Sequence, residues 1–206
     1  MIDDVALRVV DRPRLEDERE LIAACIRREP AAERLLFRRE FARVNATAYR
    51  ILGSKHETDD VVQETFIAVF RALSQFRGDA KLSTWIDRIA VRVVYQQLAQ
   101  RRRAPIPLEL VLEQPDRGGP LDEQIRARDG LRQLYEVLDE LKPEPRMAFA
   151  LYAIDGRSIA EVAELTRTTA LVAKLRIWRA RREVAKRAAR RPLLAEYLAE
   201  RGEGEP

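Results

Sequence analysis

The sequence predicts an all-α protein built of two small helical domains joined by a flexible linker. Apolar residues recur at helical spacing in both halves of the chain, and these halves are rich in alanine, leucine, arginine and glutamate. A stretch rich in proline and glycine separates them, and only 6% of the 206 residues are aromatic. The expected order is an extension (1–14), a first domain (15–103), a linker (104–125), a second domain (126–191) and a tail (192–206).

The clearest helix of the first domain lies in the segment DDVVQETFIAVFRAL. Its apolar positions recur at helical spacing and predict one buried stripe, consisting of Val62, Phe66, Val69, Phe70 and Leu73. Asp60, Gln63 and Glu64 fall on the polar side, near the helix start, where the helix dipole favours negative charge. After the break at Gly78, a second helix is expected from Ser83 or Thr84, with Trp85 in its apolar face.

The linker is predicted from residues that interrupt helices. Prolines stand at positions 105, 107, 115 and 120, and a glycine pair stands at 118–119. Helical periodicity resumes near Asp122, pauses at Pro143 and Pro145, and ends at Gly156. The tail after Pro192 has the composition of one more short helix.

The segment from Ser158 to Arg182 predicts a helix–turn–helix. Ser158 and Glu161 have the spacing of a capping box, and Thr169 is the expected N-cap of the second helix. That helix has a buried stripe of Ala173, Ile177, Ala180 and Val184. Its other face is basic, as insertion into a major groove requires. An ordinary helical hairpin with a charged exterior would show much of the same pattern.

The charge distribution also points to a polyanion. Residues 157–191 hold eleven Lys and Arg against three acids, and residues 76–103 hold seven against two. The stretch between them, 104–145, has ten acids and five basic residues. Two basic segments around an acidic connector suggest two contacts with nucleic acid. Arginine-rich helices that are merely solvated are the alternative.

Three stretches together resemble the extracytoplasmic-function (ECF, group IV) RNA polymerase sigma factors. They are ETDDVVQETFIAVFRALSQFRGDAKLSTWIDRIA, the basic end QQLAQRRR, and LDELKPEPRMAFALYAIDGRSIAEVAEL with the following AKLRIWRARR. The resemblance covers roughly residues 20–103 and 126–187, and the order and spacing of both halves agree. It implies that the first domain is a sigma region 2 bundle and the second a sigma region 4 helix–turn–helix.

For the first domain, the resemblance implies two binding surfaces. Asp60, Gln63 and Glu64 would bind the clamp helices of the largest subunit of core RNA polymerase. The −10 promoter element would be contacted by Phe76, Arg77, Lys81, Arg88 and Arg92. Trp85 could offer a stacking surface to an unpaired base. Its place in the apolar stripe instead favours a core position.

For the second domain, the resemblance implies a −35 element contacted by Arg167, Lys174, Leu175, Arg176, Trp178 and Arg179. Two departures from the family pattern bear on this reading. The usual turn glycine is replaced within Arg167–Thr169, which predicts a different local backbone or strain. Leu175 stands where a polar residue is usual, so hydrogen-bonded readout is lost there. The promoter sequence therefore cannot be taken from a relative.

The expected partners are core RNA polymerase (clamp helices and flap), promoter DNA and an anti-sigma factor, with no small-molecule substrate. No catalytic constellation, cofactor or metal site is expected, because the chain has one histidine, His56 in an expected loop, and one cysteine, Cys25 in an apolar run. Neither a signal peptide nor a transmembrane run is recognisable. The protein is expected to be cytoplasmic, and nucleoid-associated when bound to polymerase.

Two other readings remain open from the sequence alone. A degenerate sigma-like chain could bind polymerase or an anti-sigma factor without selecting promoters, which the altered turn and Leu175 would favour. An ordinary helix–turn–helix repressor would leave the DDVVQETF segment unexplained.

Overall fold

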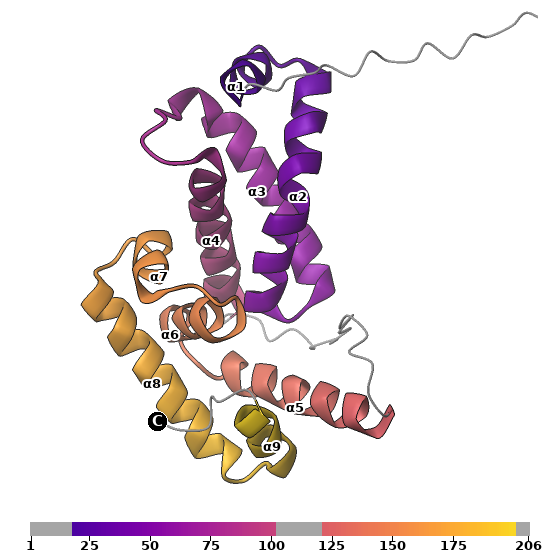
Figure 1. Ribbon diagram of the computed structural model, residues 1–206, viewed down its shortest axis with the longest axis vertical. Helices are drawn as coiled ribbons and strands as arrows, with labels where there is room; N and C mark the ends of the chain where they lie inside the picture. The colour runs from indigo at the N-terminus through magenta and orange to yellow at the C-terminus, as the bar shows by residue number, and fades with distance from the viewer. Residues whose placement is uncertain (1–17, 102–120, 201–206) are drawn as a thin grey trace, which may run out of the picture.

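The computed structural model describes residues 18–101 and 121–200, and all regular structure within them is helical (Figure 1). The first half contains α1 (Glu18–Ile26), α2 (Pro30–Leu52), α3 (Lys55–Ala72), the short helix η1 (Leu73–Gln75) and α4 (Leu82–Arg101). The second half contains α5 (Leu121–Asp139), α6 (Pro143–Phe149), the π-helix η2 (Ala150–Ile154), α7 (Ile159–Leu165), α8 (Ala170–Ala188) and α9 (Pro192–Glu200). The all-α prediction is confirmed. The predicted extension, and the linker up to residue 120, lie outside the described residues. Residues 121–125 were assigned to the linker but form the start of α5, because the last helix-breaking residue of the linker is Pro120.

The junction between α2 and α3 follows from local chemistry. Gly53 ends α2 in the left-handed conformation (φ 72°), which glycine adopts without steric penalty. Its lack of a side chain is needed a second time, because a Cβ there would lie 2.4 Å from the ring of Tyr135 on α5. Ser54 then caps α3 by accepting a hydrogen bond from the backbone N–H of Glu57. The chain therefore turns sharply while α5 packs directly against the turn.

The predicted buried stripes are largely present. Val62, Phe66, Val69 and Leu73 are at most 3% exposed, whereas Phe70 is only partly buried. Trp85 is half-buried against the same core, as its place in the apolar stripe predicted. Cys25 is also a core residue, and burial is the main cause that raises the pKa of its thiol to about 11.

The expectation for His56 was wrong. It lies in the first turn of α3 rather than in a loop. Ser54 caps the helix, which therefore begins at Lys55, the residue before His56. The imidazole is highly exposed, and its Nδ1 lies 3.5 Å from a carboxylate oxygen of Asp60.

The two halves pack on each other. One hydrophobic core contains residues of α1–α4 together with Met147, Leu151, Val162 and Ile177 of the second half. A second core lies within the C-terminal half, between α5, α8 and α9. In Figure 1, α6 and α7 lie beside the lower ends of α2 and α4. This arrangement places the candidate surfaces of both halves relative to each other.

Candidate nucleic-acid interface

The polar face of α3 lies in solvent. Asp60, Gln63 and Glu64 are all exposed, on the side of the helix opposite its buried stripe. Beside them lies an apolar groove of about 390 Å³ whose wall includes both Gln63 and the ring of Phe66. This face therefore combines carboxylates with accessible apolar surface, the composition of a protein-docking site.

Sequence reasoning missed the aromatic part of this surface. Phe37 and Phe41 of α2 are 36% and 39% exposed, and Ile67 of α3 is 42% exposed. The ring centroid of Phe37 lies 5.2 Å from that of Phe41 and 4.6 Å from that of Phe66. The spacing of Phe37 and Phe41, four residues apart on one helix, was the available signal.

The loop between η1 and α4 carries part of the predicted −10 surface. Phe76 is half-buried and packs edge-to-face on Trp85, with ring centroids 5.4 Å apart. Arg77 and Lys81 are exposed on the same loop. The loop turns at Gly78, whose φ is 79°. An aromatic anchor thus holds a loop that presents two cations.

The recognition helix α8 has the two faces that its sequence predicted. The hydroxyl of Thr169 caps it by accepting from the N–H of Val172, and the predicted inner stripe is buried. Of the six residues predicted to contact the −35 element, four are exposed on this helix, namely Lys174, Leu175, Trp178 and Arg179. Arg176 is half-buried, and Arg167 is exposed in the turn before the helix. The guanidinium of Arg182 stacks over Trp178, 5.5 Å from the ring centroid, and adds a further cation to this face.

The predicted capping box at the start of α7 is present as well. Ser158 accepts from the N–H of Glu161, while the Glu161 carboxylate accepts from the backbone N–H and the hydroxyl of Ser158. These hydrogen bonds lower the pKa of the Glu161 carboxyl. The first helix of the helix–turn–helix is therefore fixed at its start.

The turn between α7 and α8 keeps a glycine-type backbone without glycine. The N–H of Thr168 donates to the carbonyl of Ala163, and that of Arg167 donates to the carbonyl of Glu164. This is the Schellman pattern, and Arg167 occupies its left-handed position with φ 49°. The strain predicted from the missing glycine therefore falls on Arg167.

Replacing Arg167 with glycine is expected to stabilise the fold by about 1 kcal/mol, because an L residue in this conformation is strained by roughly that amount. Urea unfolding of the full chain measures the change. Arg167→Ala is the matched control, since it removes the same charge but keeps the Cβ. Equal stability of the two variants would show that the turn is not strained.

A buried arginine joins the two halves. Arg146 of α6 is 2% exposed and donates to the carbonyls of Ile51 and Leu52 at the end of α2. It also pairs with Asp139, which in turn pairs with Arg101 at the end of α4. Arg146 thus satisfies carbonyls that α2 cannot satisfy itself.

A buried carboxylate forms a second joint. The side chain of Asp155 is 1% exposed and pairs with Arg50 of α2 and with Arg157. The hydroxyl of Thr47 lies 3.4 Å from the Oδ2 atom of Asp155, the oxygen that Arg157 also binds. Arg157 also reaches Asp87 of α4. Together with the shared core, these contacts hold the second half against α2 and α4.

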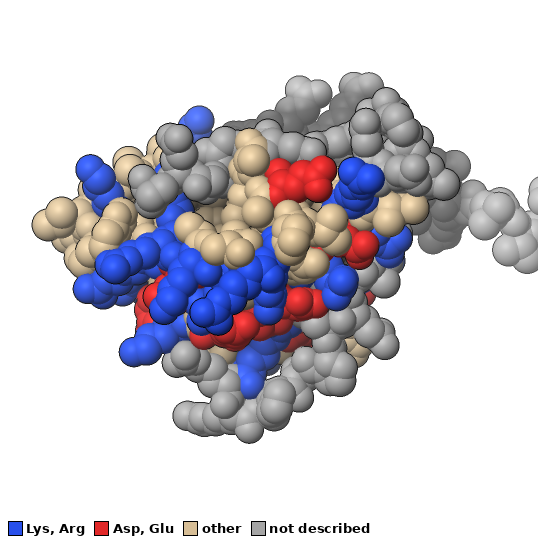
Figure 2. Space-filling model, turned by 90° about the horizontal axis from the view of Figure 1, so that it is seen from below, with Lys and Arg blue, Asp and Glu red and all other residues tan. Residues whose placement is uncertain are grey.

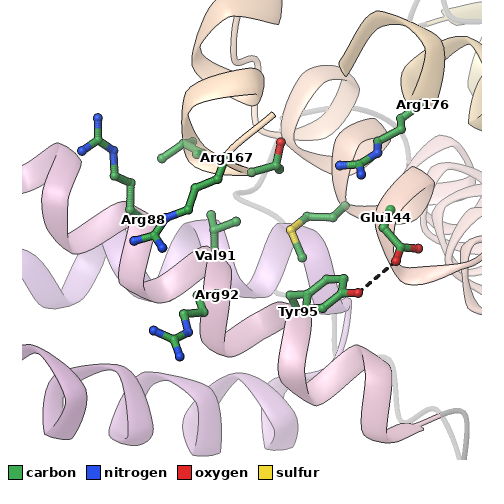
Figure 3. A pocket seen from close by; sticks show the side chains of 10 residues that line it. Arg88, Val91, Arg92, Tyr95, Glu144, Arg167 and Arg176 are labelled. Carbon is green, nitrogen blue, oxygen red and sulfur yellow. Dashed lines mark hydrogen bonds between the residues drawn. The ribbon is translucent and has the colours of Figure 1, made fainter. Parts of the chain in front are cut away.

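Four of the predicted DNA-binding residues meet at this junction. Arg88 and Arg92 of α4 lie opposite Arg167 and Arg176 across a pocket of about 330 Å³ (Figure 3). Arg88 pairs with Glu164 of α7 at 2.6 Å, whereas Phe76, Arg77 and Lys81 do not line the pocket. The pocket also contains a hydrogen bond that the sequence did not indicate, from the hydroxyl of Tyr95 to Glu144 at 2.9 Å, which raises the pKa of Tyr95.

The face seen from below carries basic and acidic side chains close together (Figure 2). Ion pairs connect α5 and its C-terminal end to the end of α8, where Arg187 lies 2.8 Å from Glu140 and 2.5 Å from Glu183. Arg191 adds a longer contact to Glu136 at 3.4 Å. Because these cations already have carboxylate partners, this face is less suited to phosphate than the outer face of α8.

Two other features are absent from the described residues. There, no helix has both the length and the apolar character that crossing a bilayer demands. Across 18–101 and 121–200, no cluster of three His, Cys, Asp or Glu side chains could hold a metal ion.

Two protein families match the chain along most of its described length. Residues 36–104 match Sigma-70 region 2, and residues 131–184 match Sigma-70, region 4. Among curated proteins, the ECF RNA polymerase sigma-E factor of Escherichia coli K12 is 34% identical over 137 residues, which are 62% of this chain and 72% of that protein. The RNA polymerase sigma-H factor of Pseudomonas aeruginosa is 27% identical over 190 residues, covering 88% and 97% of the two chains.

Two solved structures share the fold. CnrH, in complex with the cytosolic domain of CnrY, matches with a TM-score of 0.58 at 25% identity, over 84% of this chain and 97% of CnrH. The sigma factor RpoE of Bartonella quintana, in complex with the anti-sigma factor NepR, matches with a TM-score of 0.55 at 22% identity, over 81% and 96% of the chains.

Proposed function

Because this chain belongs to the ECF RNA polymerase sigma factors, we propose that its exposed α3 face binds core polymerase and that α4 and α8 contact the promoter. The protein is a sigma factor, which binds core RNA polymerase and directs promoter-specific initiation of transcription. We assign region 2 to residues 15–103 and region 4 to residues 126–191. Core binding belongs to Asp60, Gln63 and Glu64.

The observation that carries this assignment is the coexistence of two exposed surfaces. The acidic face of α3 and the basic outer face of α8 are both accessible. A chain that only bound a regulator would not need the second, and a simple repressor would not need the first. Run-off transcription with purified core polymerase tests the function. Transcripts from discrete genomic start sites are expected, and their absence with active core would contradict it.

In the structure the two halves of the chain pack on each other, an arrangement that we call closed. This arrangement affects how the protein can bind a promoter. Elements named −10 and −35 lie about 25 base pairs apart, roughly 85 Å along B-DNA at 3.4 Å per base pair. In the closed chain, the predicted −10 residue Arg88 is paired with Glu164 of the −35 domain. The two halves must therefore separate before both elements can be bound at once.

The free chain is accordingly expected to bind promoter duplex only weakly, with affinities in the non-specific range of about 10⁻⁴–10⁻⁶ M at physiological salt. Core polymerase should make binding specific, because it supplies the energy that holds the halves apart. A gel-shift titration with and without core checks this. A tight, sequence-specific complex of the free chain would contradict it.

Reading of the −35 element by α8 gives a second prediction. Arg179→Ala should weaken the free energy of binding to the preferred −35 sequence by about 1–3 kcal/mol and relax the preference at one base pair. The reason is that arginine can donate two hydrogen bonds to guanine. Lys174→Ala should weaken binding to all sequences alike. It should also reduce the slope of log binding constant against log salt concentration by about one unit, as expected for a phosphate contact. Transcription of a randomised −35 library with each variant measures both. An unchanged preference profile for Arg179→Ala would remove that residue from the reading set.

An anti-sigma factor is the proposed regulator. CnrH, which shares this fold at 25% identity, was solved with the cytosolic domain of CnrY. The groove of α2 and α3 offers such a partner exposed aromatic surface, including Phe37 and Phe41. We place the protein in the cytoplasm, on the nucleoid when bound to polymerase, and without catalysis of its own.

A further inference from the structure

The pocket between the two halves has walls from both of them. One wall is α4, and the other is formed by α6, the α7–α8 turn and α8 (Figure 3). Its floor is formed by the apolar side chains of Val91, Met147 and Leu165, which are largely buried. A volume of about 330 Å³ is within the range of small-molecule sites. Because both halves contribute, the pocket exists only when they are closed.

The polar lining carries an excess of positive charge. Four arginines, Arg88, Arg92, Arg167 and Arg176, stand against one carboxylate, Glu144. Within the described part of the chain, an ion pair engages Arg88, but no carboxylate is paired with the other three. Figure 3 shows the side chain of Arg167 extending toward α4 and that of Arg176 extending from α8, while the Glu144 carboxylate is turned toward Tyr95. Like charges brought together by closure repel each other, so an anion between them would stabilise the closed chain.

The pocket lining combines groups that can bind phosphate with groups that can bind a planar base. Guanidinium groups bind phosphate through paired hydrogen bonds. Tyr95 is 38% exposed and lines the pocket beside its apolar floor, where a planar base can stack on the ring. Glu144 can accept N–H hydrogen bonds from such a base, as carboxylates do from base edges. We propose that this pocket binds a nucleoside triphosphate, which bridges the two halves and holds the chain closed.

Such a ligand would oppose promoter binding without touching Lys174, Trp178 or Arg179, which do not line the pocket. It binds only the closed form, so at ten times its Kd it raises the ratio of closed to open chains about elevenfold. It also occupies Arg88 and Arg176, which were predicted to contact DNA. The nucleotide pool would thereby set the fraction of chains ready to join polymerase.

Calorimetric titration of the full chain with GTP tests the proposal, without DNA or polymerase, so its failure leaves the sigma function untouched. GTP is expected to bind one to one and about tenfold more tightly than inorganic triphosphate, which lacks the base. Arg176→Gln should weaken GTP binding about tenfold, the value of one charge-assisted hydrogen bond. Glu144→Gln should weaken GTP but not inorganic triphosphate.

Arg190→Gln is the matched control, because Arg190 is an exposed arginine just after α8 that does not line the pocket. It should change GTP binding by less than about twofold. An equal loss in Arg190→Gln and Arg176→Gln would reveal diffuse surface attraction and overturn the site. No saturable binding would do the same, and equal affinity for GTP and inorganic triphosphate would overturn the nucleoside assignment. In solution scattering, bound GTP should lower the radius of gyration, whereas an unchanged or larger value would refute the bridging role.

Discussion

A chain carrying Asp60→Lys and Glu64→Lys is expected to lose transcription with core polymerase by about a hundredfold or more, because juxtaposed like charges at an interface cost several kcal/mol. Both carboxylates are exposed on α3, opposite its buried stripe. The fold should therefore be unaffected. Run-off transcription and co-purification with core polymerase measure the loss, and circular dichroism checks the fold.

The control for this variant must make the same change in net charge elsewhere. Glu20→Lys with Glu196→Lys does so on α1 and α9, at two other exposed glutamates. That chain should transcribe within about twofold of the original, since exposed surface charges, including the exposed pair of Glu196 with Arg126, contribute little. If Asp60→Lys/Glu64→Lys still co-purifies with core polymerase, the assigned docking face is wrong.

Arg146→Met is expected to open the closed chain. Removing the guanidinium leaves the Ile51 and Leu52 carbonyls without this donor in the interior. Removing one partner of a buried ion pair destabilises by about 3–5 kcal/mol. Separation of the halves would let the freed groups hydrate, so the loss cannot exceed the free energy of closure. A larger radius of gyration in solution scattering and a lower midpoint of urea unfolding are the expected results.

Arg132→Met is the matched control, because Arg132 is an exposed arginine of α5 that pairs only at the surface, 2.7 Å from Glu136. Its effect on unfolding should be below about 0.5 kcal/mol. Transcription by Arg146→Met with saturating core should stay within about twofold, since closure is lost in the polymerase complex anyway. An unchanged radius of gyration would show that Arg146 does not hold the halves together.

Local pattern was enough to predict the helices and the faces of α3 and α8. The stripe from Val62 to Leu73 and the caps at Ser158 and Thr169 depend on spacing within a few residues, which the sequence displays directly. The strain at Arg167 was also visible, as a glycine position filled by arginine. The sequence did not show whether the turn changes or keeps its left-handed conformation, because only the backbone of the folded chain shows that it is kept.

Closure was decided by the tertiary structure. Arg146 meets carbonyls 94 and 95 residues earlier in the chain, and Asp155 meets Arg50 across 105 residues. No periodicity in the sequence links such distant positions. The sequence also does not distinguish an arginine that will be buried from one that will be exposed to solvent. The same holds for the basic pocket. Two of its arginines lie on α4 and two on the α7–α8 turn and α8, and they share a site only because α4 packs against the second half. The sequence by itself determined the helices and their exposed faces, since these follow from contacts between near neighbours. Which polar groups are buried together depends on how preformed helices pack, and that is settled only in the folded chain.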